Sequence, residues 1–163
     1  MPEARPRFIT SDGLNRLRGE YDALFGSERP KLVETIAWAA ANGDRSENGD
    51  YIYGRKKLRE IDRRLSYLAR IMKAAKVVDP AAQPRDEVRF GATVTLADEQ
   101  DVQREVTIVG DDETDADAGR IGWNAPLARA LIGARVGDER VVSLPVGEKS
   151  YAVIAITYSS SRA

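Results

Sequence analysis

A regular spacing of apolar residues over positions 58–75 constrains the fold of this chain more than any other feature. The spacing alternates between three and four residues, which is typical of a helix with one buried face, and its positions are Leu58, Ile61, Leu65, Leu68, Met72 and Ala75. An earlier segment repeats the rhythm at Leu14, Leu17, Tyr21 and Leu24. Because neither helix can bury its stripe alone, the sequence predicts two antiparallel helices packed as a coiled-coil hairpin.

The first helix of this hairpin is expected to be interrupted near its middle. The apolar spacing loses its phase over residues 25–30 and resumes at Leu32, Ile36 and Ala39. Proline removes an internal backbone hydrogen bond, so Pro30 together with Gly26 predicts a kink or a break. Thr10 and Ser11 are candidate N-caps for this helix, and residues 42–46 are the expected bend between the arms.

A second module is predicted after the proline-containing linker at residues 80–84. Segments rich in Val, Ile, Thr and Tyr predict strands at 88–96, 102–109, 139–144 and 151–158. A short helix is expected over Pro126–Ile132, closed by Gly133. We therefore expect an α+β protein with a helical hairpin over residues 1–79, whose tip is at 43–51, and a small antiparallel sheet domain over residues 80–163.

Composition limits the chemistry available to the chain. It contains neither cysteine nor histidine, which excludes disulfides, thiolate nucleophiles, histidine bases and the usual zinc sites. Apolar runs are too short to cross a bilayer, so we expect a cytoplasmic protein. We also expect it to be a monomer. Lys and Arg outnumber Asp and Glu by 16 to 12 in residues 1–79, whereas they are outnumbered by 14 to 9 in residues 80–163. This asymmetry favours two modules with different partners.

The hairpin tip carries the acids Asp44, Glu47 and Asp50, for which the sequence leaves two interpretations open. Asp44 and Glu47 have the spacing of a capping box, which would make Asp44 the N-cap of the second helix. The other interpretation is that these carboxylates provide oxygen ligands to Mg²⁺. Two ligands on a protruding tip form an incomplete site, so a second molecule would have to supply the others.

A strongly basic face lies directly behind the tip. Residues 55–73 contain eight Lys or Arg residues against Glu60 and Asp62, and the candidate contacts are Arg55, Lys56, Lys57, Arg59, Arg63 and Arg64. Such a surface can be an ordinary solvated helix face with i, i+4 ion pairs. A net charge of +6 over 19 residues favours instead a polyanion such as RNA, or DNA bound without sequence preference.

Together these segments resemble the bacterial Gre transcript-cleavage factors, and in particular the GreB type. Residues 38–51 and 55–64 are similar to the tip and basic arm of that family, and the similarity continues through residues 90–94, 108–113, 126–133 and 136–138. There are two departures. Gly49 stands where alanine is usual, which loosens the start of the second helix by up to about 1 kcal/mol. Ala125 replaces the usual serine before Pro126 and puts that serine's hydrogen bond in doubt.

The resemblance implies a fold, a partner and roles for particular residues. The C-terminal domain would be FKBP-like and would bind bacterial RNA polymerase, with Asn124 and Pro126 at the contact. The hairpin would enter the secondary channel, where Asp44 and Glu47 would hold a Mg²⁺ ion shared with the polymerase. The polymerase would then cleave the 3′ end of backtracked nascent RNA, so this chain would be a cofactor and not an enzyme. Ser46, Asn48, Asp50 and Tyr51 would shape the tip.

Other functions remain open at this stage. A regulator with the same architecture could occupy the secondary channel without stimulating cleavage. A free-standing Mg²⁺ nuclease is disfavoured because the tip offers too few ligands, and a prolyl isomerase is disfavoured because the C-terminal module has few aromatic residues. The acidic run at residues 111–117 lacks the spacing of a calcium loop, and we expect it to be a solvated turn.

Overall fold

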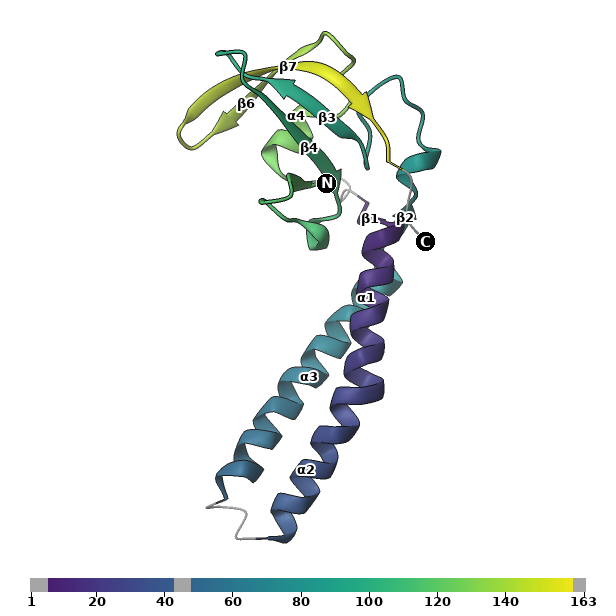
Figure 1. Cartoon of the computed structure of the whole chain (residues 1–163), viewed down its shortest axis with the longest axis vertical. Coiled ribbons are helices and arrows are strands. Elements are labelled where there is room, and N and C mark those ends of the chain that lie inside the picture. Colours follow the sequence, from purple (N-terminus) through teal and green to yellow (C-terminus); the bar gives the residue numbers. More distant parts are fainter. Residues whose placement is uncertain (1–5, 43–47, 160–163) are drawn as a thin grey trace, which may run out of the picture. The chain divides into compact units, whose positions relative to one another are not determined.

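The computed structural model describes residues 6–42 and 48–159 (Figure 1). It divides into two compact units: Asn15–Ala74, and Met1–Leu14 together with Ala75–Ala163. The first is helical and the second is built around a sheet, so the predicted α+β class is confirmed. Within the described residues, no helix combines the length and the apolar character that crossing a membrane requires.

The helical unit is an antiparallel hairpin whose first arm is made of three segments. These are α1 (Ser11–Ala23), a π-helical segment (Leu24–Glu28) and α2 (Arg29–Ala41), and α3 (Gly49–Ala74) runs back along α2 (Figure 1). Helix α1 starts in the other unit, where the Oγ1 of Thr10 accepts a hydrogen bond from the Gly13 amide at 3.0 Å. Thr10 is therefore confirmed as an N-cap.

The predicted interruption of the first arm is confirmed as a π-helical segment. The amide of Arg29 donates to the carbonyl of Leu24, five residues earlier, and Pro30 lies in the first turn of α2. A π-type turn takes in an extra residue, so it corrects the phase of the apolar stripe while the chain stays helical. The slip read from the sequence thus marks a real change of helix type.

The buried stripe of the hairpin differs from the predicted one at its C-terminal end. Ile61, Leu65 and Leu68 are buried as expected, but Ile71 is buried where Met72 was predicted, and Met72 is half-buried. The step after Leu68 is thus three residues where four was predicted, and either step keeps a side chain near the same side of a helix. Gly54 allows close contact between the arms, because a Cβ there would lie 2.7 Å from the Cγ1 of Ile36.

Two ion pairs fix the register of the hairpin arms. The guanidinium of Arg64 binds the carboxylate of Glu20 through two contacts of 2.9 Å each. Arg29 binds Asp62 at 2.8 and 3.4 Å, and this hydrogen bond and charge raise the pKa of Arg29. Because both pairs join residues of opposite arms, they disfavour sliding of one arm along the other.

The sheet unit contains five strands in the order β5-β4-β3-β7-β6. Their bounds are Thr93–Ala97 for β3, Gln103–Val109 for β4, Arg120–Gly122 for β5, Glu139–Leu144 for β6 and Gly147–Thr157 for β7. The pairs among β3, β4, β6 and β7 are antiparallel, but β5 pairs parallel with β4, so the sheet is mixed and not wholly antiparallel as predicted. A separate parallel pair joins β1 (Phe8–Thr10) to β2 (Lys76–Val78), and the sequence did not reveal it.

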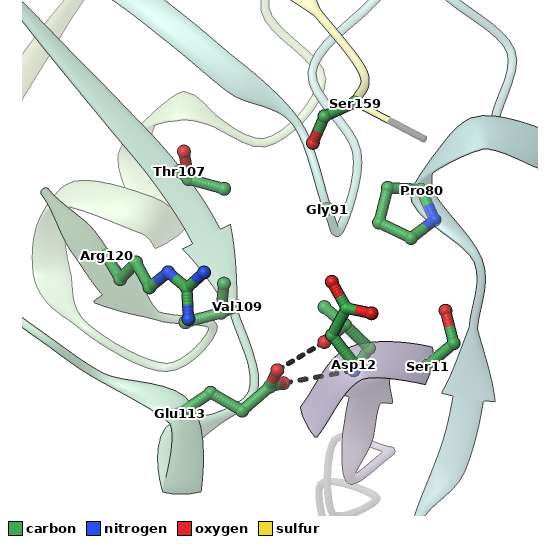
Figure 2. A pocket seen from close by; sticks show the side chains of 10 residues that line it. Ser11, Asp12, Pro80, Gly91, Thr107, Val109, Glu113, Arg120 and Ser159 are labelled. Atoms are coloured by element: carbon green, nitrogen blue, oxygen red, sulfur yellow. Dashed lines mark hydrogen bonds between the residues drawn. The ribbon is translucent and has the colours of Figure 1, made fainter. Parts of the chain in front are cut away.

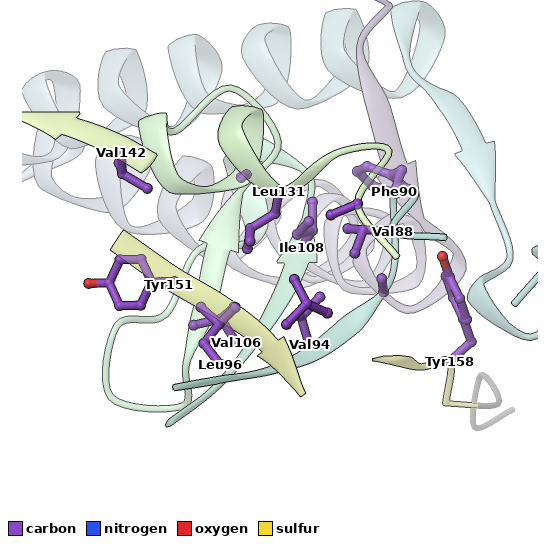
Figure 3. Close-up of a cluster of buried hydrophobic side chains, with 14 residues drawn as sticks. Val88, Phe90, Val94, Leu96, Val106, Ile108, Leu131, Val142, Tyr151 and Tyr158 are labelled. Atoms are coloured by element: carbon purple, nitrogen blue, oxygen red, sulfur yellow. The ribbon is translucent and has the colours of Figure 1, made fainter. Parts of the chain in front are cut away.

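Helix α4 (Pro126–Leu131) covers one face of this sheet and closes the core (Figure 3). Alternate residues of β3 and β4 point into the core, as the pleat of a strand requires. The buried cluster comprises Val88, Phe90, Ala92, Val94, Leu96, Val106, Ile108, Ala128, Leu131, Ala134, Val142, Tyr151, Val153 and Tyr158. Phe8 of β1 packs on the edge of this cluster, with ring centroids 5.3 Å from Phe90 and 5.2 Å from Trp123.

The strand predicted over residues 88–96 begins only at Thr93. Gly91 has a φ of +91°, which ends extended pairing in the direction of Val88. Val88 instead exchanges hydrogen bonds with the segment after α4, because its amide donates to Ala134 and its carbonyl accepts from Gly133, both at 2.8 Å. The apolar character of residues 88–92 therefore reflects burial in the core and not membership of the sheet.

Candidate functional site

The hairpin end is described on both sides of the predicted acidic site. Asp44, Ser46 and Glu47 fall within residues 43–47, outside the described residues, so their predicted roles stay predictions. Asn48, Asp50 and Tyr51 are described at the start of α3. Among residues 6–42 and 48–159, no three His, Cys, Asp or Glu side chains are grouped so as to hold a metal ion.

Asn48 is the N-cap of α3. Its Oδ1 accepts a hydrogen bond from the amide of Tyr51 at 3.2 Å, and its carbonyl accepts the first helical bond from Ile52 at 3.0 Å. The same side chain donates through Nδ2 to the carbonyl of Ala39 at 2.7 Å, which ties the start of α3 to the end of α2. Asn48 thus satisfies the first turn of one helix and the last turn of the other.

This cap corrects the structural interpretation of the acidic tip. The spacing assigned the cap of the second helix to Asp44, but α3 begins at Gly49 and its third amide is bonded to Asn48. Asp50 is exposed in the first turn of α3, where a negative charge interacts favourably with the helix dipole. The N-cap of α3 is therefore Asn48 and not Asp44.

The basic face of α3 is exposed but not uniform. All six predicted RNA contacts are exposed: Arg55, Lys56, Lys57, Arg59, Arg63 and Arg64. Arg64 is engaged within the hairpin, since it binds Glu20 and lies 5.3 Å from the ring centroid of Tyr67. Farther along, Arg59, Arg63 and Arg70 line a shallow concave surface with Asp62 and Ser66.

The predicted polymerase contacts of the sheet unit lie at the start of α4. The side chain of Asn124 donates to Asp111 at 2.6 Å, and its backbone amide donates to the other oxygen of the same carboxylate at 3.1 Å. Pro126 is exposed in the first turn of α4. Ala125 occupies the N-cap position without a side-chain hydrogen bond, so the bond expected from a serine is indeed missing at this position.

The acidic run at residues 111–117 is only partly the solvated turn that was predicted. Glu113 is 7% exposed, and its carboxylate accepts hydrogen bonds from the amides of Thr10 (3.0 Å) and Gly110 (2.8 Å) and from the Thr10 hydroxyl. Gly13 makes room for this carboxylate, because a Cβ there would lie 2.2 Å from it. Glu113 therefore fastens the start of α1 to the sheet unit, and Asp111 holds Asn124.

A pocket beside Glu113 is too small to be a substrate site (Figure 2). Figure 2 shows the Glu113 carboxylate directed toward the start of α1, with Arg120 and Thr107 on the sheet side and Pro80 opposite. The cavity is about 50 Å³, which corresponds to a few water molecules. The candidate site is therefore on the surface of the hairpin and not in this pocket.

Comparisons with known proteins agree along the chain. Residues 7–77 match the model of the N-terminal domain of transcription elongation factors, and residues 83–158 match the model of the GreA/GreB C-terminal domain. The chain is 46% identical over 152 residues to transcription elongation factor GreB of Neisseria meningitidis serogroup B, covering 93% of each protein. It is 44% identical to GreB of Yersinia pestis, over 95% of this chain and 91% of that protein.

A solved structure of a prokaryotic GreA/GreB transcription elongation factor from Nitrosomonas europaea is 25% identical, with a TM-score of 0.41, over 93% of this chain and 98% of that one.

Proposed function

The chain belongs to the GreA/GreB family of transcription elongation factors, and from this premise we propose that it rescues backtracked RNA polymerase by stimulating cleavage of the nascent RNA 3′ end. The polymerase performs the hydrolysis, and this chain supplies groups that the polymerase active site lacks. The hairpin enters the secondary channel, and the sheet unit binds the polymerase surface.

The observation that carries this proposal is the capping of α3 by Asn48. A carboxylate used as a helix cap is committed to backbone amides, whereas here the side-chain oxygen of Asn48 accepts from the amide of Tyr51. The N-cap position of α3 thus belongs to Asn48, and Asp44 does not occupy it. Asp44 and Glu47 are then candidates for contact with another molecule.

The donor chemistry of these acids fits Mg²⁺, which prefers carboxylate oxygens and keeps part of its water shell. Asp44 and Glu47 supply two ligands, and the polymerase carboxylates complete the site in the complex. When bound, such an ion beside the polymerase's own metal stabilises the attacking and leaving oxygens of the phosphodiester. The isolated chain, with only two ligands, holds the ion weakly.

The exposed cations of α3 bind the RNA extruded from the active site. Arg55, Lys56, Lys57, Arg59 and Arg63 follow the tip over about two and a half turns, and their contacts with phosphates are independent of base sequence. Arg64 contributes less, because its guanidinium is bound to Glu20. Binding of this kind weakens as salt concentration rises.

The sheet unit binds the polymerase through the exposed start of α4. Asp111 fixes the side chain of Asn124, and Pro126 fixes the first turn of the helix beside it. A rigid pair of exposed residues lowers the entropy lost on binding. We expect Asn124→Ala to weaken polymerase binding while leaving cleavage intact once the factor is in excess.

The test is cleavage of end-labelled RNA in a stalled, backtracked elongation complex, with and without this protein, over a series of Mg²⁺ concentrations. The proposal predicts shortened RNA whose new 3′ end resumes elongation when nucleotides are added. Binding to the polymerase without faster cleavage would identify the protein as a non-cleaving regulator of the secondary channel. Hydrolysis of RNA by the isolated protein would instead show that it is a nuclease in its own right.

A further inference from the structure

Aromatic side chains are followed directly by basic ones on the first turns of α3. Tyr53 is 65% exposed, and Lys56 and Lys57 follow it on the same helix with exposed side chains. Residues three and four apart on a helix are neighbours, about 5–6 Å apart at Cβ. Tyr53 and the two lysines therefore form one continuous patch of an aromatic ring and two cations.

The hairpin packing holds this patch on the outside. Gly54 is buried against Ile36 of α2. Its neighbours Tyr53 and Arg55 are exposed, so their side chains lie outside that contact. Asp50, one turn before Tyr53, lies on the side of the acidic tip, whereas the lysines lie on the side of the basic arm. Tyr53 thus lies on α3 between the acidic residue Asp50 and the basic residues that begin at Arg55.

We propose that Tyr53 is a stacking platform for a base of single-stranded RNA whose phosphates bind Lys56 and Lys57. The proposal rests on the proposed function, in which the RNA 3′ end reaches the hairpin, and it assigns the contact made by a base. Proteins that bind single strands without sequence preference combine a cationic track with aromatic rings in this way. Stacking is tolerant of sequence because every base has a π-face, which suits a factor that must act on any transcript.

A protein partner fits this patch less well than RNA. The comparison within the hairpin is Trp38 of α2, which is also 65% exposed but has Glu34, Thr35, Ala41 and Asn42 as its neighbours at three and four residues. None of these four neighbours is a cation, and such a ring is suited to an apolar contact. Tyr53 differs because it is joined to two cations, and a polyanion with π-faces satisfies both kinds of group.

The experiment measures binding of the full-length protein to two fluorescent oligomers by anisotropy at low ionic strength. One is RNA of about ten uridines, and the other is an abasic sugar–phosphate oligomer of the same length. The proposal predicts that Tyr53→Ala weakens binding of the uridine RNA by roughly fivefold or more and leaves binding of the abasic oligomer unchanged. Tyr53→Phe keeps the ring and is expected to bind both like wild type, as is the matched control Trp38→Ala.

The outcomes separate this inference from the proposed function, because the assay contains no polymerase. Wild-type affinity of Tyr53→Ala for uridine RNA would overturn the stacking role. Equal losses for both oligomers would also overturn it and would assign Tyr53 a role in positioning the lysines. Unchanged RNA binding, with weaker binding of Tyr53→Ala in a separate polymerase-binding assay, would show that the ring contacts protein. Failure to stimulate cleavage, by contrast, would refute the proposed function alone.

Discussion

Two turns of this protein are rich in acids, and they use them differently. In the run at residues 111–117, Glu113 is buried and accepts three hydrogen bonds, while Asp111 holds Asn124. At the hairpin end, the helix start that acids could have satisfied is capped by the amide of Asn48. In the first turn the carboxylates accept hydrogen bonds that hold the fold, whereas at the hairpin end the N-cap of α3 is an amide side chain and not one of the acids.

The difference shows that the donors around a carboxylate decide its role, and the density of acids does not. A buried carboxylate persists where amides and hydroxyls satisfy it, as Thr10 and Gly110 do for Glu113. An acid that is not needed by the backbone can be retained for a ligand or partner. The following predictions test whether the two turns differ in this way, beginning with the largest effect on stability.

Glu113→Ala should lower the free energy of unfolding by about 3 kcal/mol, because it leaves buried donors of Thr10 and Gly110 without their acceptor. Urea unfolding followed by circular dichroism measures the change. Asp117→Ala, at an exposed position of the same acidic run, is the matched control and should stay within about 0.5 kcal/mol of wild type. A loss below 1 kcal/mol for Glu113→Ala would show that this carboxylate is dispensable for folding.

Asn48→Ala should cost about 1 kcal/mol, since it removes the N-cap of α3 and the bond to the carbonyl of Ala39. The same unfolding measurement applies, and the helical signal should fall slightly. Asn48→Asp keeps the capping oxygen and loses the bond to Ala39, so its stability should lie between those of wild type and Asn48→Ala. Unchanged stability of Asn48→Ala, together with a loss in Asp44→Asn, would return the cap to Asp44.

Ala125→Ser should raise the free energy of unfolding by about 0.5–1 kcal/mol, because a hydroxyl at this N-cap can accept a bond from the first turn of α4. Ala125→Gly is the control, since it changes the backbone freedom at the cap without adding an acceptor. No difference between the serine and glycine variants would show that the hydroxyl does not reach the amide. This is the departure from the family that the structure makes easiest to test.

Asp86 represents a third use of an acid, an exposed ion pair, and should have the smallest effect. The hydrogen bond from Arg89, at 2.6 Å, holds the pKa of Asp86 below its ordinary value. A lowered pKa in the folded state stabilises the protein above the ordinary pKa of the carboxyl, and this contribution is lost as the pH falls through the folded value. The stability difference between wild type and Asp86→Asn should therefore disappear in acid, and it should shrink in high salt.

Local patterns in the sequence predicted the hairpin well, because helix periodicity is a property of neighbouring residues. They located the interruption near Pro30, the cap at Thr10 and the short helix after Ala125. They placed Met72 in the stripe in place of Ile71, because steps of three and four residues both stay near one side of a helix and periodicity alone does not choose between them.

Contacts between distant parts of the chain were beyond the reach of such patterns. Thr10 and Glu113 are 103 residues apart, so the acidic run looked like an ordinary turn. Strands β1, β2 and β5 contain three residues each, which is too few for a periodic signal in the sequence. At the hairpin tip, the spacing of Asp44 and Glu47 predicted a cap at Asp44, and only the hydrogen bonds of Asn48 show which residue caps α3.

The central claim is that the tip acids serve the polymerase active site and not the fold. The most direct measurement is RNA cleavage in a backtracked elongation complex saturated with Asp44→Asn, alongside the melting temperature of the same variant. We predict cleavage at the level seen without the factor, with wild-type polymerase binding and an unchanged melting temperature. Cleavage at the wild-type rate, or a melting temperature several degrees lower, would contradict the claim.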